Sequence, residues 1–155
     1  MPEVGEKAPL FEGQTQGGDA VRLADYQGQK VALYFYPKDD TPGCTKQACN
    51  LRDNYQILLD AGIAVLGVSP DDVASHEKFA DKYDLPFPLF ADPTHTILEA
   101  YGVWGEKNMY GRKFMGVKRT TFLIDENGMI RHVFKRPNVK MHTAEILEKF
   151  EALEA

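Results

Sequence analysis

Apolar runs and amphipathic stretches alternate along the chain, and this alternation predicts strands and helices in turn. Residues 30–36 and 63–68 are continuous apolar runs of strand length, each closed by a proline, Pro37 and Pro70. Runs of this kind are typical of strands that are buried on both faces of a sheet. Further strands are predicted over residues 21–23, 89–90, 117–124 and 129–134, with a hairpin turn at 125–128 between the last two.

Apolar residues at spacings of three and four predict helices between these strands. The longest helix is expected from about Pro42 to Asp60, because Thr41 is a good N-cap, proline is favoured at the first helical position and Gly62 ends the pattern. Other helices are predicted at about residues 73–83, 97–101 and 143–153. We expect residues 1–19 to form an extended lead-in and residues 102–116 to be irregular.

The resulting order, β-α-β-α-β-α-β-β-α, predicts an α/β fold in which helices flank a mixed central sheet. The parallel strands come first and the antiparallel hairpin last, which is a thioredoxin-like arrangement. A length of 155 residues, without a repeat or a linker, suits one domain over residues 1–155.

Composition narrows the class of function. Formal net charge is −5 and the basic residues are scattered, so no nucleic-acid partner is predicted. The first seven residues lack the apolar segment of a signal peptide, and no run approaches the roughly 18 apolar residues of a membrane span. We therefore expect a soluble, cytoplasmic protein that binds no membrane and needs no cofactor.

Cys44 and Cys49 are the only cysteines, and they open the helix that follows the first buried strand. Backbone N–H groups and the helix dipole at that end stabilise a thiolate. In an intact helix, positions five apart lie about 8.6 Å apart between Cα atoms. A disulfide needs no more than about 7 Å, so pairing the two thiols requires the helix to unwind. The asymmetry suggests that Cys44 is an activated nucleophile and that Cys49 resolves its product.

Other interpretations of the two cysteines are open at this point. Both can be inert core residues, since free cysteine is commonly buried. A CxxC oxidoreductase needs two intervening residues rather than four. A copper carrier of similar fold could use both thiolates and a histidine. None of the four histidines is at paired ligand spacing with the cysteines, and each is expected on a helix surface or in a loop: His76, His95, His132 and His142. A protein whose disulfide switches an interaction surface is a third class.

A family resemblance extends over nearly the whole chain. It rests above all on the Pro-x-x-x-Thr-x-x-Cys element from Pro37 to Cys44. The stretches that carry it are residues 34–45, 48–49, 51–53, 69–72, 75–79, 85–89, 101–107 and 119–125. These residues are similar to the signature of the peroxiredoxin Q family, also called the bacterioferritin comigratory protein family.

The resemblance implies an atypical two-cysteine peroxiredoxin, a thiol peroxidase that reduces hydrogen peroxide and organic hydroperoxides. It assigns Cys44 as the peroxidatic cysteine and Cys49 as the resolving one. Pro37, Thr41 and Arg119 match the proline, threonine and arginine of the family's active site. The implied reductant is thioredoxin, sometimes glutaredoxin, and the implied state is a monomer.

The chemistry explains why such residues are needed. An unperturbed cysteine is only about 3% thiolate at pH 7, so full ionisation raises the rate of attack by about thirtyfold. The remaining rate enhancement of an efficient peroxidase must come from stabilising the charge that builds on the leaving oxygen. Arg119 can favour the thiolate and can also stabilise the charge on the leaving oxygen. Thr41 can donate a hydrogen bond to the peroxide and accept one from it. Pro37 has no N–H and can shield the sulfenic acid. Each residue also has a plainer interpretation: Arg119 as a surface arginine, Thr41 as a helix N-cap and Pro37 as a strand terminator.

Overall fold

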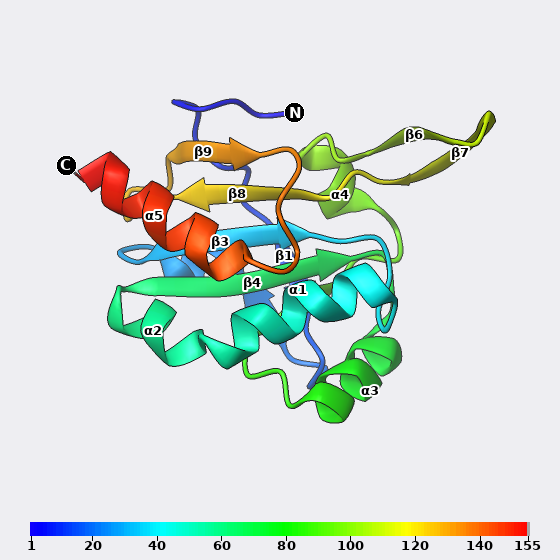
Figure 1. The fold of residues 1–155 in the computed structure, drawn as a ribbon, viewed down its shortest axis with the longest axis horizontal. Coiled ribbons are helices and arrows are strands. Elements are labelled where there is room, and N and C mark those ends of the chain that lie inside the picture. The colour runs from blue at the N-terminus through cyan, green and yellow to red at the C-terminus, as the bar shows by residue number, and fades with distance from the viewer. Residues whose placement is uncertain (155) are drawn as a thin grey trace.

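The computed structural model describes residues 1–154, and a seven-stranded sheet lies at its centre (Figure 1). The strands are β1 (Glu12–Gln14), β2 (Ala20–Arg22), β3 (Lys30–Phe35), β4 (Ile63–Ser69), β5 (Leu89–Ala91), β6 (Trp104–Met109), β7 (Arg112–Val117), β8 (Thr120–Ile124) and β9 (Ile130–Phe134). The helices are the 3-10 turn η1 (Leu23–Tyr26), α1 (Pro42–Asp53), α2 (Tyr55–Asp60), α3 (Val73–Tyr83), α4 (Thr96–Ala100) and α5 (His142–Glu154).

The sheet has the order β2-β1-β5-β4-β3-β8-β9 and is mixed, as predicted. The three central strands β3, β4 and β5 run parallel, and all other neighbours pair antiparallel. Two registers matter for the site. Phe35 pairs with Val68 of β4 and with Thr120 of β8. The C-terminal ends of β3 and β4 therefore lie beside the start of β8. The loops after β3 and β4 meet the residue before β8 at this end of the strands.

The helices form two layers around the sheet. Side chains of β3 alternate between them: Leu33 and Phe35 belong to one apolar cluster, and Ala32 and Tyr34 to the other. The first cluster is covered by α4 and the N-terminal segment, and the second by α1, α2, α3 and α5. In Figure 1, α1, α2 and α5 lie in front of the sheet. Cys44 belongs to the second cluster, so the core itself holds the start of α1 in place.

The predicted helix from Pro42 to Asp60 is interrupted at Asn54, which separates α1 from α2. Asn54 leaves the helical conformation at φ −115° and ψ 17°. Its side-chain amide donates to the carbonyl of Asn50 at 2.8 Å, which competes with the helical hydrogen bonds of the backbone. The prediction for α3 is confirmed at both ends. At its start, Asp72 caps the first turn by accepting from Ser75 N–H.

The expectation of an irregular segment over residues 102–116 is wrong. β6 and β7 form a two-stranded hairpin that projects from the molecule (Figure 1). Tyr110 and Gly111 form its two-residue turn with φ values of 53° and 79°, the pattern of a type I′ turn. The strands lack alternation of burial because the hairpin packs little against the core, so periodicity did not reveal them.

Smaller differences follow from tertiary pairing. The predicted strand over residues 117–124 is divided, because Val117 ends β7 and Lys118 and Arg119 lie between β7 and β8. The expected lead-in contains β1, which pairs with both β2 and β5. No helix within residues 1–154 is long and apolar enough to cross a membrane.

Candidate active site

Cys44 lies in the first turn of α1, where the chain enters the helix from the end of β3. Thr41 is the N-cap residue and Pro42 the first helical residue, so Cys44 is the third. The amides of this turn lack partners within the helix and face an incoming negative charge. Cys44 is 1% exposed, and its thiol is free. The position therefore combines a favourable helix end with exclusion of water.

Arg119 reaches this thiol from the other side of the site. One guanidinium nitrogen, Nη2, donates to Cys44 Sγ at 3.2 Å, and the other, Nη1, donates to Gln47 Oε1 at 2.6 Å. Gly43 leaves room for this approach, because a Cβ at that residue would lie in tight contact with Arg119 Nη2, at 3.2 Å. The permanently charged guanidinium therefore lies against the Cys44 sulfur, which places Arg119 at the site and not on the open surface.

Gln47 is a site residue that the sequence analysis did not identify. It is fully buried one helical turn after Cys44, and its oxygen accepts from Arg119. Its Nε2 has no protein partner among residues 1–154. A polar side chain three positions after Cys44, on the apolar face of α1, is the signal that could have identified it.

Tyr34 contributes a second buried polar atom, since its hydroxyl also lacks a partner within the described residues. Burial raises the pKa of Tyr34 well above its ordinary value, and the neighbouring Cys44 raises it further. Its ring packs closely over Gly67, where a Cβ would lie 2.9 Å from the ring. The site therefore holds a neutral phenol close to the thiol.

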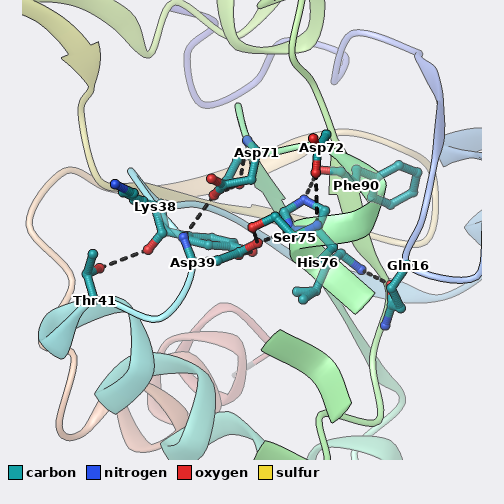
Figure 2. A network of polar contacts seen from close by, with 12 residues as sticks. Gln16, Lys38, Asp39, Thr41, Asp71, Asp72, Ser75, His76 and Phe90 are labelled. Atoms are coloured by element: carbon teal, nitrogen blue, oxygen red, sulfur yellow. Dashed lines mark hydrogen bonds and ion pairs between the residues drawn. The ribbon is translucent and has the colours of Figure 1, made fainter. Parts of the chain in front are cut away.

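Thr41 caps α1 with its backbone but not with its side chain. Its carbonyl accepts from Thr45 N–H at 2.8 Å, whereas its hydroxyl donates to the carbonyl of Lys38 at 2.8 Å (Figure 2). The expectation of a side-chain N-cap is therefore wrong, because the hydroxyl turns back toward the loop. Pro37 is half-buried and lies two residues after Phe35, the last residue of β3.

Cys49 lies in the same unbroken helix and is partly exposed. The continuity of α1 across both cysteines agrees with the geometric argument that an intact helix keeps the thiols apart. Burial raises the pKa of the Cys49 thiol, while Arg52 lowers it and Asp53 raises it by smaller amounts. Cys49 is consequently a thiol rather than a thiolate at neutral pH.

Two histidines lie elsewhere than expected. His76 and His142 are fully buried rather than on a helix surface or in a loop. His142 is hydrogen-bonded to Thr121 at 2.8 Å and to Glu145 at 3.0 Å, and burial lowers its pKa.

Within residues 1–154, the one group with metal-ligand geometry is Asp39, Asp71 and His76, which contains no cysteine. The geometry therefore gives no support to a carrier that binds copper through both thiols.

Comparisons with known proteins agree with this site. The model of the AhpC/TSA family matches residues 4–133. A putative peroxiredoxin Bcp of Coxiella burnetii is 52% identical over 145 residues, which span 94% of this chain and 96% of the relative. Peroxiredoxin Bcp of Bacillus subtilis is 44% identical over 94% of this chain and 93% of its own length. Peroxiredoxin Bcp of Escherichia coli is 49% identical over 85% of each chain.

Solved structures match as closely. A cysteine mutant of Xylella fastidiosa PrxQ superposes with a TM-score of 0.91 at 32% identity and covers 99% of this chain and 98% of its own. The bacterioferritin comigratory protein of Xanthomonas campestris, studied for alkyl peroxide reduction, has a TM-score of 0.87 at 33% identity, with 94% and 92% covered. These likenesses confirm the thioredoxin-like fold. The chain belongs to the AhpC/TSA family as a peroxiredoxin of the Bcp or PrxQ type, which is a peroxidase.

Proposed function

We propose that Cys44 is the peroxidatic cysteine of this peroxidase, that Cys49 is its resolving cysteine, and that thioredoxin recycles the disulfide between them. The observation that carries the proposal is the Arg119 guanidinium 3.2 Å from Cys44 Sγ, at the positive end of α1. Hydrogen peroxide and organic hydroperoxides are the proposed substrates, since a relative from Xanthomonas campestris was studied for alkyl peroxide reduction.

In the first step, the Cys44 thiolate attacks one peroxide oxygen. A sulfur–oxygen bond forms, the oxygen–oxygen bond breaks, and the other oxygen leaves with the electron pair and takes up a proton. Arg119 faces the sulfur and can stabilise the charge on the leaving oxygen. Gln47 holds the guanidinium in place. The Thr41 hydroxyl donates its hydrogen bond to the backbone carbonyl of Lys38, so its oxygen serves the peroxide as an acceptor. Pro37 shields the sulfenic acid.

In the second step, the start of α1 unwinds and the Cys49 thiolate attacks the sulfenic sulfur. The new sulfur–sulfur bond replaces the sulfur–oxygen bond, and the hydroxide that is expelled takes up a proton from solvent and leaves as water. An external dithiol protein then reduces the disulfide by exchange and is itself oxidised. We take thioredoxin as this reductant and glutaredoxin as the alternative. The same proposal includes a monomeric, cytoplasmic protein with one domain over residues 1–155.

A coupled peroxidase assay tests the whole cycle. Reduced protein is mixed with hydrogen peroxide or cumene hydroperoxide, with and without thioredoxin, thioredoxin reductase and NADPH. We expect sustained NADPH consumption with thioredoxin and about one equivalent of peroxide consumed without it. A glutaredoxin system replaces thioredoxin in a parallel arm.

Other outcomes of that assay are decisive. A protein that is oxidised once but recycled by neither reductant would be a redox-regulated interaction protein rather than a cycling peroxidase. A protein that leaves both peroxides untouched and carries copper after purification without chelator would be a metal carrier. Either result contradicts the proposed function.

Replacement of Arg119 with alanine is expected to slow sulfenic acid formation by about 10²–10³-fold, the usual loss for one preorganised donor at a developing oxyanion. Lysine at this position keeps the charge but loses the two guanidinium nitrogens that bond Cys44 and Gln47 at once. The rate of Arg119→Lys should therefore lie between the rates of the wild type and Arg119→Ala. Single-turnover stopped-flow kinetics measures this step directly.

Lys118 offers the matched control, because it is the exposed neighbour of Arg119 in the same connection. The Lys118→Ala variant should react at the wild-type rate. A wild-type rate in Arg119→Ala would remove Arg119 from the mechanism.

A further inference from the structure

The loop between β3 and α1 is held to α3 through the side chain of Asp39. Asp39 is only 7% exposed. Its Oδ1 accepts from the Tyr36 hydroxyl at 2.6 Å, and its Oδ2 accepts from the Ser75 hydroxyl at 2.8 Å and lies 2.7 Å from His76 Nδ1. Figure 2 shows Ser75 and His76 of α3 directed at this carboxyl group. One buried side chain thus joins the loop to a helix that is remote in sequence.

A proton must lie between His76 and Asp39. The other ring nitrogen of His76, Nε2, is 2.9 Å from the carbonyl of Phe90, which can only accept, so Nε2 carries hydrogen. Two lone pairs would repel each other across the 2.7 Å between Nδ1 and Oδ2. Whether the proton belongs to nitrogen or to oxygen, the pair is neutral as a whole. Such a pair can be buried, but neither partner can be removed without stranding the other.

The backbone of the loop is held as well. Asp39 N–H donates to Asp71 Oδ2 at 2.8 Å (Figure 2). The same oxygen accepts from the Ser69 hydroxyl at 2.7 Å. Ser69 is the last residue of β4, which lies beside β3, and Asp71 follows it two residues later. The next loop residue, Asp40, bonds Lys82 of α3, but both of those side chains are exposed and solvent screens them. Asp39 is therefore the main anchor of the loop.

A second anchor lies just after Cys49. Asn50 Nδ2 donates to the carbonyl of Lys140 at 3.0 Å, and Asn50 Oδ1 accepts from Thr143 N–H at 2.8 Å. The Thr143 hydroxyl also donates to the Asn50 carbonyl at 3.2 Å. These bonds tie α1 to the start of α5. Residues 41–49, which contain both cysteines, thus lie between two hydrogen-bonded anchors.

We propose that the Asp39–His76 pair is a latch that positions Cys44 for reaction with peroxide and confines unwinding to residues 41–49. It acts through the loop, because Asp39 is two residues before Thr41 and its hydrogen-bond partners among residues 1–154 do not include Cys44. Asp39 and His76 are positioning residues in this sense. The inference rests on the proposed function, because it concerns how the same site passes from its first step to its second.

The latch decides between two fates of the Cys44 sulfenic acid. In the folded site, a second peroxide can oxidise it to sulfinic acid, with transfer of one oxygen and release of an alcohol or water. In the unwound site, Cys49 forms the disulfide and releases water. A latch that holds the folded form favours the first reaction with peroxide but prolongs exposure to the second. Loosening it should slow sulfenic acid formation and protect the enzyme from over-oxidation.

The test compares two substitutions of one residue. Asp39→Ala removes the latch, whereas Asp39→Asn keeps it, because an amide N–H can donate to Nδ1 of a neutral His76. Hydrogen–deuterium exchange of the reduced protein, without peroxide, is the first readout. One lost hydrogen bond raises exchange about fivefold, and Asp39→Ala loses three side-chain contacts, so we expect exchange of residues 41–49 to rise by more than that, with α5 unchanged. Asp39→Asn should exchange like the wild type.

Over-oxidation is the second readout. During turnover, mass spectrometry follows the sulfinic form of Cys44 at rising peroxide concentration. Asp39→Ala should need about fivefold more peroxide for half over-oxidation than the wild type and Asp39→Asn. Ser75→Ala removes one donor to Asp39 and should shift both readouts in the same direction by less, which keeps the test valid if Asp39→Ala fails to fold. Glu77→Ala, the exposed neighbour of His76, is the control and should match the wild type.

The outcomes separate the latch from the peroxidase cycle. Equal exchange of residues 41–49 in Asp39→Ala, Ser75→Ala and the wild type would overturn the latch, even in an active peroxidase. A uniform rise over all elements would overturn it too, because it would show general destabilisation. If the wild type consumes no peroxide, the proposed function fails, and the exchange data still decide whether Asp39 holds the segment.

Discussion

Replacement of Cys44 with serine is expected to abolish peroxide reduction, with a loss on the order of 10⁴-fold or more, as for other catalytic nucleophiles. The reason is chemical: a serine hydroxyl at this position stays protonated at neutral pH, and oxygen cannot form the sulfenic acid on which the cycle depends. Cys44 is buried, so serine should alter the packing little. Stopped-flow measurement of peroxide consumption, with stoichiometric and catalytic amounts of enzyme, gives the magnitude.

Cys49→Ser provides the matched control for this result, because it makes the same change five residues away in the same helix. It should keep the first turnover that Cys44→Ser loses. Retained turnover in Cys44→Ser, in a protein with the wild-type circular dichroism spectrum, would show that another group attacks the peroxide.

The Cys49→Ser substitution has the second large expected effect, on recycling rather than on attack. One equivalent of peroxide should react at the wild-type rate, after which turnover with thioredoxin should stop because no disulfide forms. Cys44 should then accumulate as sulfenic acid and, with excess peroxide, as sulfinic acid. Mass spectrometry of samples quenched over time distinguishes these forms from the disulfide of the wild type.

The pH dependence of the wild type gives an independent check on Cys49. Burial raises the pKa of its thiol, and only the thiolate attacks sulfur. Disulfide formation should therefore be slow at neutral pH and accelerate as pH rises through this raised pKa. In Cys49→Ser that acceleration should be absent. Normal recycling of Cys49→Ser by thioredoxin, or a disulfide step that does not change with pH, would remove Cys49 from the resolving role.

The sequence by itself was sufficient where the signal is local. The buried strands β3 and β4 and the helix α3 were predicted within one residue at each end, because long apolar runs, prolines such as Pro37 and apolar spacings of three and four are patterns within a few neighbouring residues. The same holds for the position of Cys44 in the first helical turn. The separation of Cys44 and Cys49 in an intact helix also follows from the spacing alone.

Local patterns failed where elements depend on side-chain geometry or stand apart from the core. The interruption at Asn54 follows from one amide that bonds a carbonyl four residues earlier, which apolar periodicity does not register. The hairpin of β6 and β7 has few buried positions, so its strands carry no alternation, although the Tyr110-Gly111 turn was a readable signal.

The composition of the site was decided by the tertiary structure. The pairing of Phe35 with Thr120 brings Arg119 to Cys44, and the parallel pairing of β3 with β4 brings Asp71 to Asp39. Strand register is a long-range property that no local window contains. The sequence alone therefore determined that Cys44 lies in the first turn of α1 and that it cannot pair with Cys49 while this helix is folded. Only the fold brought Arg119 against the Cys44 thiol and joined Asp39 to His76, because the partners in each pair are far apart along the chain.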